Sequence, residues 1–114
     1  MMANKYNAKK VKYAGITFDS KAEYERYLIL KHLHGLGRLS DLKVHVRYWI
    51  HVAGQKAFQY EVDFLYRDHN GKEVAEDVKG VLTSTSRLKI KCFKLEYPDI
   101  EFVLIHKGKR VEKL

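Results

Sequence analysis

Two long segments in which apolar and polar residues alternate constrain the fold of this chain more than any other feature. The first covers residues 43–52, and the second covers residues 58–66 after the turn sequence AGQK. Because successive side chains of a strand point to opposite faces, the alternation predicts two paired strands with one buried face. That face is expected to contain Val44, Val46, Tyr48, Ile50 and Val52 on the first strand and Phe58, Tyr60, Val62, Phe64 and Tyr66 on the second.

A third strand is predicted after the turn sequence DHNG. It is expected to run from about Lys72 to Lys79, to end at Gly80, and to complete an antiparallel meander with the first two strands. Residues two apart on a strand share a face. Asp77 and Lys79 are therefore predicted to lie side by side, opposite the apolar face of this strand.

A helix is predicted on each side of the meander. The first starts at Asp19 or Ser20, either of which can cap its free amide groups, and ends at Gly35 or Gly37. The second covers the segment SRLKIKCFKLEY, after a run of hydroxyl residues and before Pro98. The buried stripe of the first helix is expected to comprise Tyr24, Tyr27, Leu28, Leu30 and Leu33.

A final strand, IEFVLIH, completes the order helix, three strands, helix, strand. A chain of 114 residues is long enough for about one domain. The order predicts an α/β (α+β) fold over residues 1–114, with a central mixed sheet flanked by helices. The basic N-terminal arm, residues 1–15, is expected to be mobile or to lie on nucleic acid, because it has too little apolar content to pack alone.

The chain is basic, with 22 lysine and arginine residues against 14 acidic ones and a net charge of +8. This excess favours a polyanionic partner, with nucleic acid ahead of an anionic membrane surface. No apolar run approaches the roughly 20 residues that span a bilayer, and the N-terminal residues lack the apolar core of a signal peptide. A lone cysteine, Cys92, excludes an internal disulfide. We therefore expect a soluble cytoplasmic protein.

Three acids and a lysine stand out against this background. Asp63 interrupts an otherwise apolar strand, although aspartate is a poor strand former. Glu23 lies at the start of the first helix. Mg²⁺ prefers oxygen ligands and is commonly held by one or two carboxylates plus a phosphate. Asp63 and Asp77 are predicted to bind Mg²⁺ or Mn²⁺, with Glu23 and the backbone carbonyl of Val78 as further ligands. Lys79 would orient the attacking water or stabilise the developing negative charge on a phosphodiester.

Each of these residues also has a simpler interpretation. Asp63 alone would be a solvent-facing strand residue, and Asp77 with Lys79 would be a surface charge pair. Glu23 is also explained by the preference for acids in the first turn of a helix. Glu76 is an alternative acid on the third strand, but at this position its side chain points to the opposite face from Lys79. The six histidines show no spacing typical of a metal site.

The order of the elements and four local motifs resemble the PD-(D/E)XK nuclease superfamily. The segment FDSKAE, ending at Glu23, is similar to the F-x-S-x-x-E motif of phage junction-resolving endonucleases and related transposase subunits, where the glutamate is a metal ligand. Asp63 in VDF matches the first acid, although Val62 replaces the proline, and residues 77–79 match (D/E)-x-K. The basic helix from Ser86 matches the one that follows this motif. More narrowly, the chain resembles small phage and prophage proteins of unassigned function near Holliday-junction resolvases.

The resemblance implies a restriction-endonuclease-like αβββαβ core and a metal-dependent DNA endonuclease that acts on branched DNA in phage recombination or replication, in the bacterial cytoplasm. Paired incisions across a junction would require a homodimer. The DNA contacts are expected from Lys9 and Lys10 of the arm and from Arg87, Lys91 and Lys94, which share one face of the second helix. Two alternatives remain open, namely a non-catalytic DNA-binding or architectural protein with the same fold and an RNA-binding accessory protein.

Overall fold

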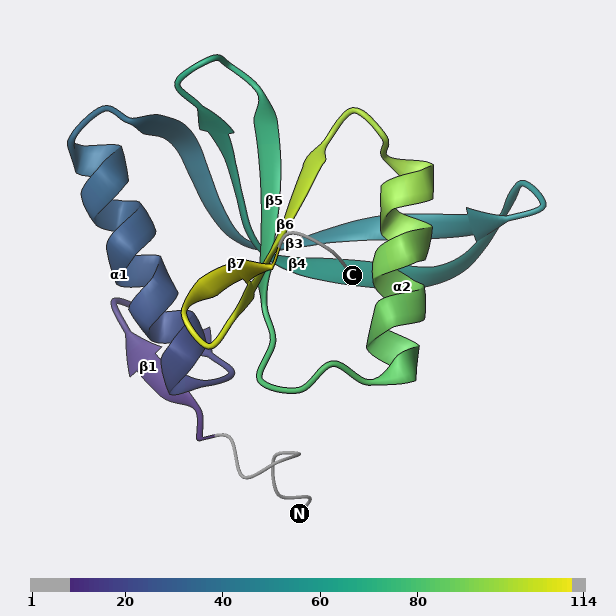
Figure 1. Cartoon of the computed structure of the whole chain (residues 1–114), viewed down its shortest axis with the longest axis horizontal. Coiled ribbons are helices and arrows are strands. Elements are labelled where there is room, and N and C mark those ends of the chain that lie inside the picture. Colours follow the sequence, from purple (N-terminus) through teal and green to yellow (C-terminus); the bar gives the residue numbers. More distant parts are fainter. Residues whose placement is uncertain (1–8, 112–114) are drawn as a thin grey trace.

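The structure, a computed structural model, describes residues 9–111, which form a five-stranded sheet, a small two-stranded sheet and two helices (Figure 1). The predicted α/β (α+β) class is confirmed. The elements in chain order are β1 (Val11–Tyr13), β2 (Ile16–Phe18), α1 (Lys21–Gly35), β3 (Leu39–Val52), β4 (Gln55–Asp68), β5 (Glu73–Val78), α2 (Ser84–Glu96), β6 (Glu101–His106) and β7 (Lys109–Val111).

The large sheet has the strand order β3-β4-β5-β6-β7. The strands β3, β4 and β5 form the predicted antiparallel meander, whereas β5 and β6 are parallel and β6 and β7 are antiparallel. A parallel pair needs a crossover connection, which α2 supplies. The sheet is therefore mixed, as predicted, and α2 lies along it on the opposite side of Figure 1 from α1.

The first helix begins after the expected cap Ser20, whereas the second begins at Ser84, before the predicted start at Ser86 and within the expected run of hydroxyl residues. The Oγ atom of Ser20 accepts a hydrogen bond of 3.1 Å from the backbone amide of Glu23, and Thr83 with Ser86 forms a capping box at the start of α2. The predicted buried stripe of α1 is wrong for Leu28, which is 38% exposed. Glu23 is buried instead, so a carboxylate occupies part of the face that α1 turns to the sheet.

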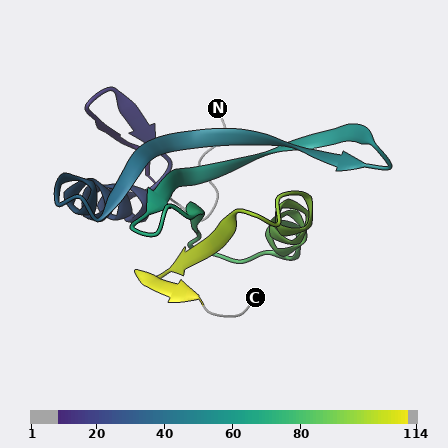
Figure 2. The same cartoon turned by 90° about the horizontal axis from the view of Figure 1, so that it is seen from above.

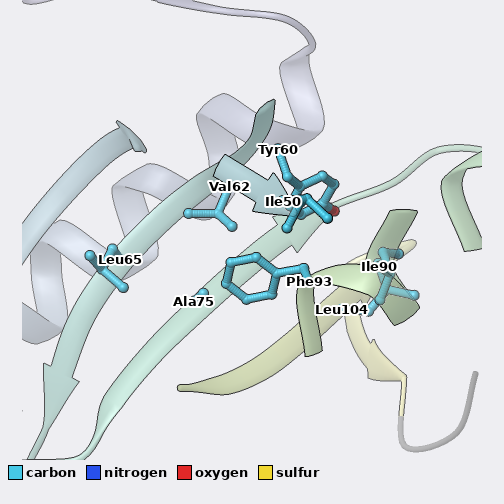
Figure 3. Close-up of a cluster of buried hydrophobic side chains, with 8 residues drawn as sticks. All are labelled: Ile50, Tyr60, Val62, Leu65, Ala75, Ile90, Phe93 and Leu104. Atoms are coloured by element: carbon cyan, nitrogen blue, oxygen red, sulfur yellow. The ribbon is translucent and has the colours of Figure 1, made fainter. Parts of the chain in front are cut away.

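Two apolar clusters hold the helices against the sheet. One surrounds Phe93 of α2 (Figure 3), and the other joins Tyr27 and Leu30 of α1 to Phe64. The neighbours Phe64 and Leu65 point to opposite faces of β4 and pack in different clusters. The two helices therefore cover opposite faces of the sheet at this point. The buried members of the α2 cluster are Ile50, Tyr60, Val62, Leu65, Ala75, Ile90, Phe93 and Leu104.

The single apolar face predicted for the β3–β4 hairpin is wrong. Val62 and Phe64 have the same parity, yet Val62 packs in the α2 cluster and Phe64 in the α1 cluster. Between the pairs Val44–Phe64 and Val46–Val62, the opposite residues His45 and Asp63 do not pair with each other. His45 has a φ of 57°. The change of buried face occurs at this point, and the outer half of the ribbon runs past α2 (Figures 1 and 2), with Val52 exposed near the tip.

The sequence predicts no strand in the N-terminal arm or in the basic tail, but the structure has one in each. β1 pairs with β2 through a two-residue turn, in which Ala14 and Gly15 both have positive φ as such tight turns require. β7 likewise adds an antiparallel edge to β6. From Val11 onward the arm therefore forms part of a hairpin, and residues 1–8 lie outside the described part of the chain.

Among the described residues, neither α1 nor α2 is long and apolar enough to cross a membrane.

Candidate metal centre

Glu23, His45 and Asp63 converge from α1, β3 and β4. Each offers one ligand atom, and these atoms all lie within 4.8 Å of one another. The convergence occurs at the interruption of the β3–β4 pairing, where His45 and Asp63 would otherwise face each other across the ladder. The sequence prediction includes Glu23 and Asp63 in the site but not His45.

Glu23 is 3% exposed and is held from two sides. Its Oε1 atom lies 2.6 Å from Nε2 of His45, and its Oε2 atom accepts a hydrogen bond of 3.2 Å from the backbone amide of Asp19. Burial raises the pKa of Glu23, although the contact with His45 opposes this effect. Glu23 is therefore a fixed group of the site and not merely an acid near a helix N-terminus.

His45 reaches this position through an unusual backbone conformation. Its φ of 57° lies in the left-handed region, which non-glycine residues adopt rarely and often at functional sites. The ring of Phe18, which is fully buried, lies 6.2 Å from the imidazole between ring centroids. The sequence offers little signal for His45, because neither its spacing nor its parity reveals a local change of backbone direction.

The side chains of Asp63 and Asp77 each accept a hydrogen bond from a backbone amide of the other residue's strand or of the residue that ends it. The Oδ2 atom of Asp63 accepts a hydrogen bond of 2.7 Å from the backbone amide of Val78, and the Oδ1 atom of Asp77 accepts one of 2.9 Å from the backbone amide of Asp63. These bonds follow the Phe64–Glu76 pair, with which the backbone ladder between β4 and β5 ends. The two predicted acids are thus brought together at the point where β4 and β5 separate.

The three carboxylates lie in an environment that disfavours their negative charge. Burial raises the pKa of Asp63 well above its ordinary value, and the charges of Asp77 and Glu23 add to this effect. Burial also raises the pKa of Asp77, although Lys79 opposes the shift. Because a cation lowers the cost of holding several carboxylates together, the arrangement favours binding of one.

Asp77 has protein partners on both oxygen atoms. It is 1% exposed, its Oδ2 atom accepts a hydrogen bond from the hydroxyl of Tyr60, and the same oxygen lies 3.8 Å from Nζ of Lys79. Burial and the nearby charge of Asp77 raise the pKa of Tyr60, so its hydroxyl keeps the proton that it donates. Asp77 and Lys79 are side by side, as predicted, but the group with metal-ligand spacing comprises Asp63, Glu23 and His45.

Lys79 follows the last residue of β5 and has a fixed backbone. Its amide donates a hydrogen bond of 2.9 Å to the carbonyl of Ile105, and its carbonyl lies 2.9 Å from Nδ1 of His106. These contacts attach the start of the β5–α2 connection to β6. The side chain of Lys79 is 29% exposed, so its ammonium group is accessible to a ligand in solvent.

A family model described as "Protein of unknown function (DUF1064)" matches residues 3–113. The chain belongs to the DUF1064 family. A comparison with curated proteins gives no match. Since the DUF1064 description states no activity, the inference of function depends on the geometry of the site.

Four further residues of this DUF1064 protein, Val78, Glu76, Lys9 and Lys10, were considered in the sequence prediction of the site. The carbonyl of Val78 is predicted to be a ligand, but the contact in the structure is from its amide to Asp63. Glu76 lies on the other face of β5, as its parity predicts, and bonds to Arg26. The predicted DNA-binding residues Lys9 and Lys10 are exposed, and Lys10 pairs at 3.4 Å with Asp19.

The second group of predicted DNA-binding residues lies along α2. Arg87, Lys91 and Lys94 are all exposed and, with Leu95, line an open groove of about 510 Å³. Their spacing along the helix therefore produces the predicted cationic face.

The donor set at the centre of this DUF1064 protein fits a divalent cation. Two carboxylates and one imidazole provide oxygen and nitrogen ligands, and all three side chains are held by hydrogen bonds within the protein. Their separation allows one ion to contact all three. Glu23, His45 and Asp63 are the residues that would hold it.

Proposed function

We propose that this DUF1064 protein is a metal-dependent DNA endonuclease of the PD-(D/E)XK superfamily. The observation that carries the proposal is the link between Asp63 and Asp77, whose backbone and side chain join at 2.9 Å, with Lys79 beside Asp77 at 3.8 Å. Two carboxylates and an ammonium group thus meet at one end of adjacent strands, as the resemblance implies. The position of Glu23, in the same cluster as Asp63, supports the proposal.

Each side chain has a defined part in the proposed reaction. Glu23, His45 and Asp63 would hold the divalent cation, which when bound polarises a phosphoryl oxygen and lowers the pKa of a bound water. Lys79 stabilises the negative charge that develops on the phosphoryl oxygens as water attacks in line and the bond to the leaving oxygen breaks. Asp77 positions Lys79, and Tyr60 in turn fixes the carboxylate of Asp77.

We further propose that the substrate is branched DNA. The support is the FDSKAE motif at the start of α1, which is similar to that of junction-resolving endonucleases, together with the exposed cations of α2. Lysine and arginine side chains that contact phosphates increase affinity without reading sequence. One centre cuts one strand, so paired cuts at a junction would require two copies of the chain. A protein that sediments as a monomer both alone and on a junction would contradict the dimer.

The proposal is tested by incubating the protein with a labelled four-way junction or the matching linear duplex, in Mg²⁺, Mn²⁺ or chelator. We expect metal-dependent cutting, with a preference for the junction. The variants Asp63→Asn, Asp77→Asn and Lys79→Met should each reduce the cutting rate by at least about 100-fold. Glu23→Gln should do the same, whereas Glu25→Gln, at an exposed position of the same helix, should leave the rate unchanged.

The alternatives predict different results in the same assay. DNA binding without cutting under every metal condition would overturn the nuclease proposal and favour a DNA-binding or architectural protein. Competition with an RNA of matched sequence would detect an RNA-binding protein, which would be released from DNA by the RNA.

A further inference from the structure

We infer that the metal centre selects a first-row transition ion such as Mn²⁺ over Mg²⁺, because His45 places an imidazole nitrogen among its ligands. The inference rests on the proposed function in assigning a cation to this cluster. The donor atoms of the cluster identify the chemical class of that cation.

The donor set differs from the set that Mg²⁺ prefers. Mg²⁺ takes hard oxygen ligands in near-ideal octahedral geometry and keeps several of its waters. Imidazole nitrogen suits Fe²⁺, Ni²⁺, Cu²⁺ and Zn²⁺ best, whereas carboxylate oxygen suits Mg²⁺ and Mn²⁺ alike. Mn²⁺ is the weakest-binding of these first-row ions, but it accepts an imidazole nitrogen more readily than the harder Mg²⁺ does. Glu23 and Asp63 would therefore accept either ion, whereas His45 favours the transition ion.

His45 is held at the centre by its backbone conformation and by its contact with Glu23. Its backbone has a φ of 57° within a strand, its ring lies beside the buried Phe18, and its Nε2 atom is 2.6 Å from Glu23. The imidazole is 26% exposed, which leaves solvent and ions access to the cluster. A ligand held in this way imposes its nitrogen on any ion that Glu23 and Asp63 bind together.

A second histidine of β3 provides the contrast. Nδ1 of His51 lies 2.6 Å from Oε1 of Glu96, the same distance as in the His45–Glu23 pair. The group of potential metal ligands found among the described residues contains Glu23, His45 and Asp63 but not this pair. A histidine–carboxylate pair at hydrogen-bond distance is therefore not itself the site, and the added carboxylate of Asp63 makes the difference.

The test compares Mn²⁺ and Mg²⁺ affinities of the full chain without DNA, by titration calorimetry and by the electron paramagnetic resonance signal of free Mn²⁺. The variant His45→Asn suits the position, because asparagine tolerates a left-handed backbone and replaces nitrogen with an amide oxygen. We expect it to lower Mn²⁺ affinity at least about tenfold and to change Mg²⁺ affinity much less. His51→Asn is the matched control and should alter neither affinity.

The ratio of the two affinities decides the inference, because carboxylates alone bind both ions. An unchanged ratio in His45→Asn, or equal affinities in the unmodified protein, would overturn it. If His45→Asn does not fold, as judged by circular dichroism, His45→Gly accommodates the positive φ without a donor and should show the same loss of Mn²⁺ affinity.

The titration contains no substrate, so its result is separable from the nuclease assay. Selective Mn²⁺ binding by a protein that cuts no DNA would overturn the proposed function and leave the metal inference standing. Efficient cutting by a protein that binds Mn²⁺ and Mg²⁺ equally would overturn the metal inference and leave the proposed function standing.

Discussion

Arg26 on α1 donates two hydrogen bonds, of 2.7 and 2.8 Å, to the buried carboxylate of Glu76 on β5. The hydroxyl of Tyr66 donates to the same carboxylate. Arg26 lies one helical turn after Glu23, and Glu76 directly precedes Asp77. This ion pair therefore links the helix and the strand that carry two acids of the candidate centre, and it fixes how α1 lies against β5.

We expect Glu76→Ala to lower the free energy of unfolding by about 3 kcal/mol, because it leaves the partly buried guanidinium of Arg26 without its partner. The measurement is urea unfolding followed by circular dichroism. The control is Glu61→Ala, which removes the more exposed Arg47–Glu61 pair of 3.1 Å and should cost less than about 1 kcal/mol. Equal destabilisation of the two variants would show that the Arg26–Glu76 pair does not anchor α1.

Asp63→Asn is expected to stabilise the protein at pH 8 in chelator by about 1 kcal/mol, as substitutions that relieve a functional site commonly do. Burial raises the folded-state pKa of Asp63, so the folded state binds more protons than the unfolded state between the two pKa values. Stability is therefore lost as pH rises through the folded pKa, and the penalty is absent below the unfolded pKa. Asparagine keeps the oxygen that accepts from Val78 but carries no charge.

The comparison uses urea unfolding at pH 8 and at pH 4. The gain from Asp63→Asn should be present at pH 8 and nearly absent at pH 4. A variant less stable than the unmodified protein at pH 8 would mean that the negative charge of Asp63 is favourable in the folded state, contrary to the direction of its pKa shift.

Divalent cations should stabilise the unmodified protein at neutral pH. A ligand that binds only the folded state adds about 2.7 kcal/mol at a free concentration of 100 times its Kd. We expect Mn²⁺ to raise the Tm by several degrees in the unmodified protein and much less in Asp63→Asn, which lacks one charged ligand. An equal rise in both proteins would place the bound ion elsewhere in the molecule.

Much of the fold could be predicted because its signals are local. Three features follow from neighbouring residues: the period of two in β3 and β4, the cap at Ser20, and the side-by-side placement of Asp77 and Lys79. The three-residue strands β1, β2 and β7 escaped prediction, because so short a segment shows no periodicity.

The centre itself could be predicted only in part. Glu23 and Asp63 were identifiable from motifs, but His45 joins them through a positive φ and through the way α1 packs on the sheet. The same local change of backbone direction assigns Val62 and Phe64, which have the same parity, to different apolar clusters. Neither effect is encoded in a spacing, because each depends on interactions between residues far apart in the chain.

Tyr60→Phe is expected to lower stability by about 1–3 kcal/mol, because it leaves a buried oxygen of Asp77 without its hydroxyl donor. If Tyr60 also positions Asp77 for the proposed reaction, the variant should cut DNA more slowly at a temperature where it is fully folded. Tyr48→Phe is the control, since its ring packs on the same Phe93. Cutting at the normal rate by a folded Tyr60→Phe protein would limit Tyr60 to a structural role.

The cationic face of α2 should contribute to DNA affinity through its interactions with phosphates. Replacing Arg87, Lys91 and Lys94 together with alanine is expected to weaken binding of junction and duplex alike, because phosphate contacts carry no sequence information. For every phosphate that the variant no longer neutralises, the slope of log affinity against log salt should become shallower by about 0.9 for duplex DNA. The measurement is fluorescence anisotropy across a salt series, with Lys72→Ala, at an exposed position before β5, as the control. An unchanged slope in the triple variant would show that DNA binds on another face, because the charge of these residues would then not be neutralised in the complex.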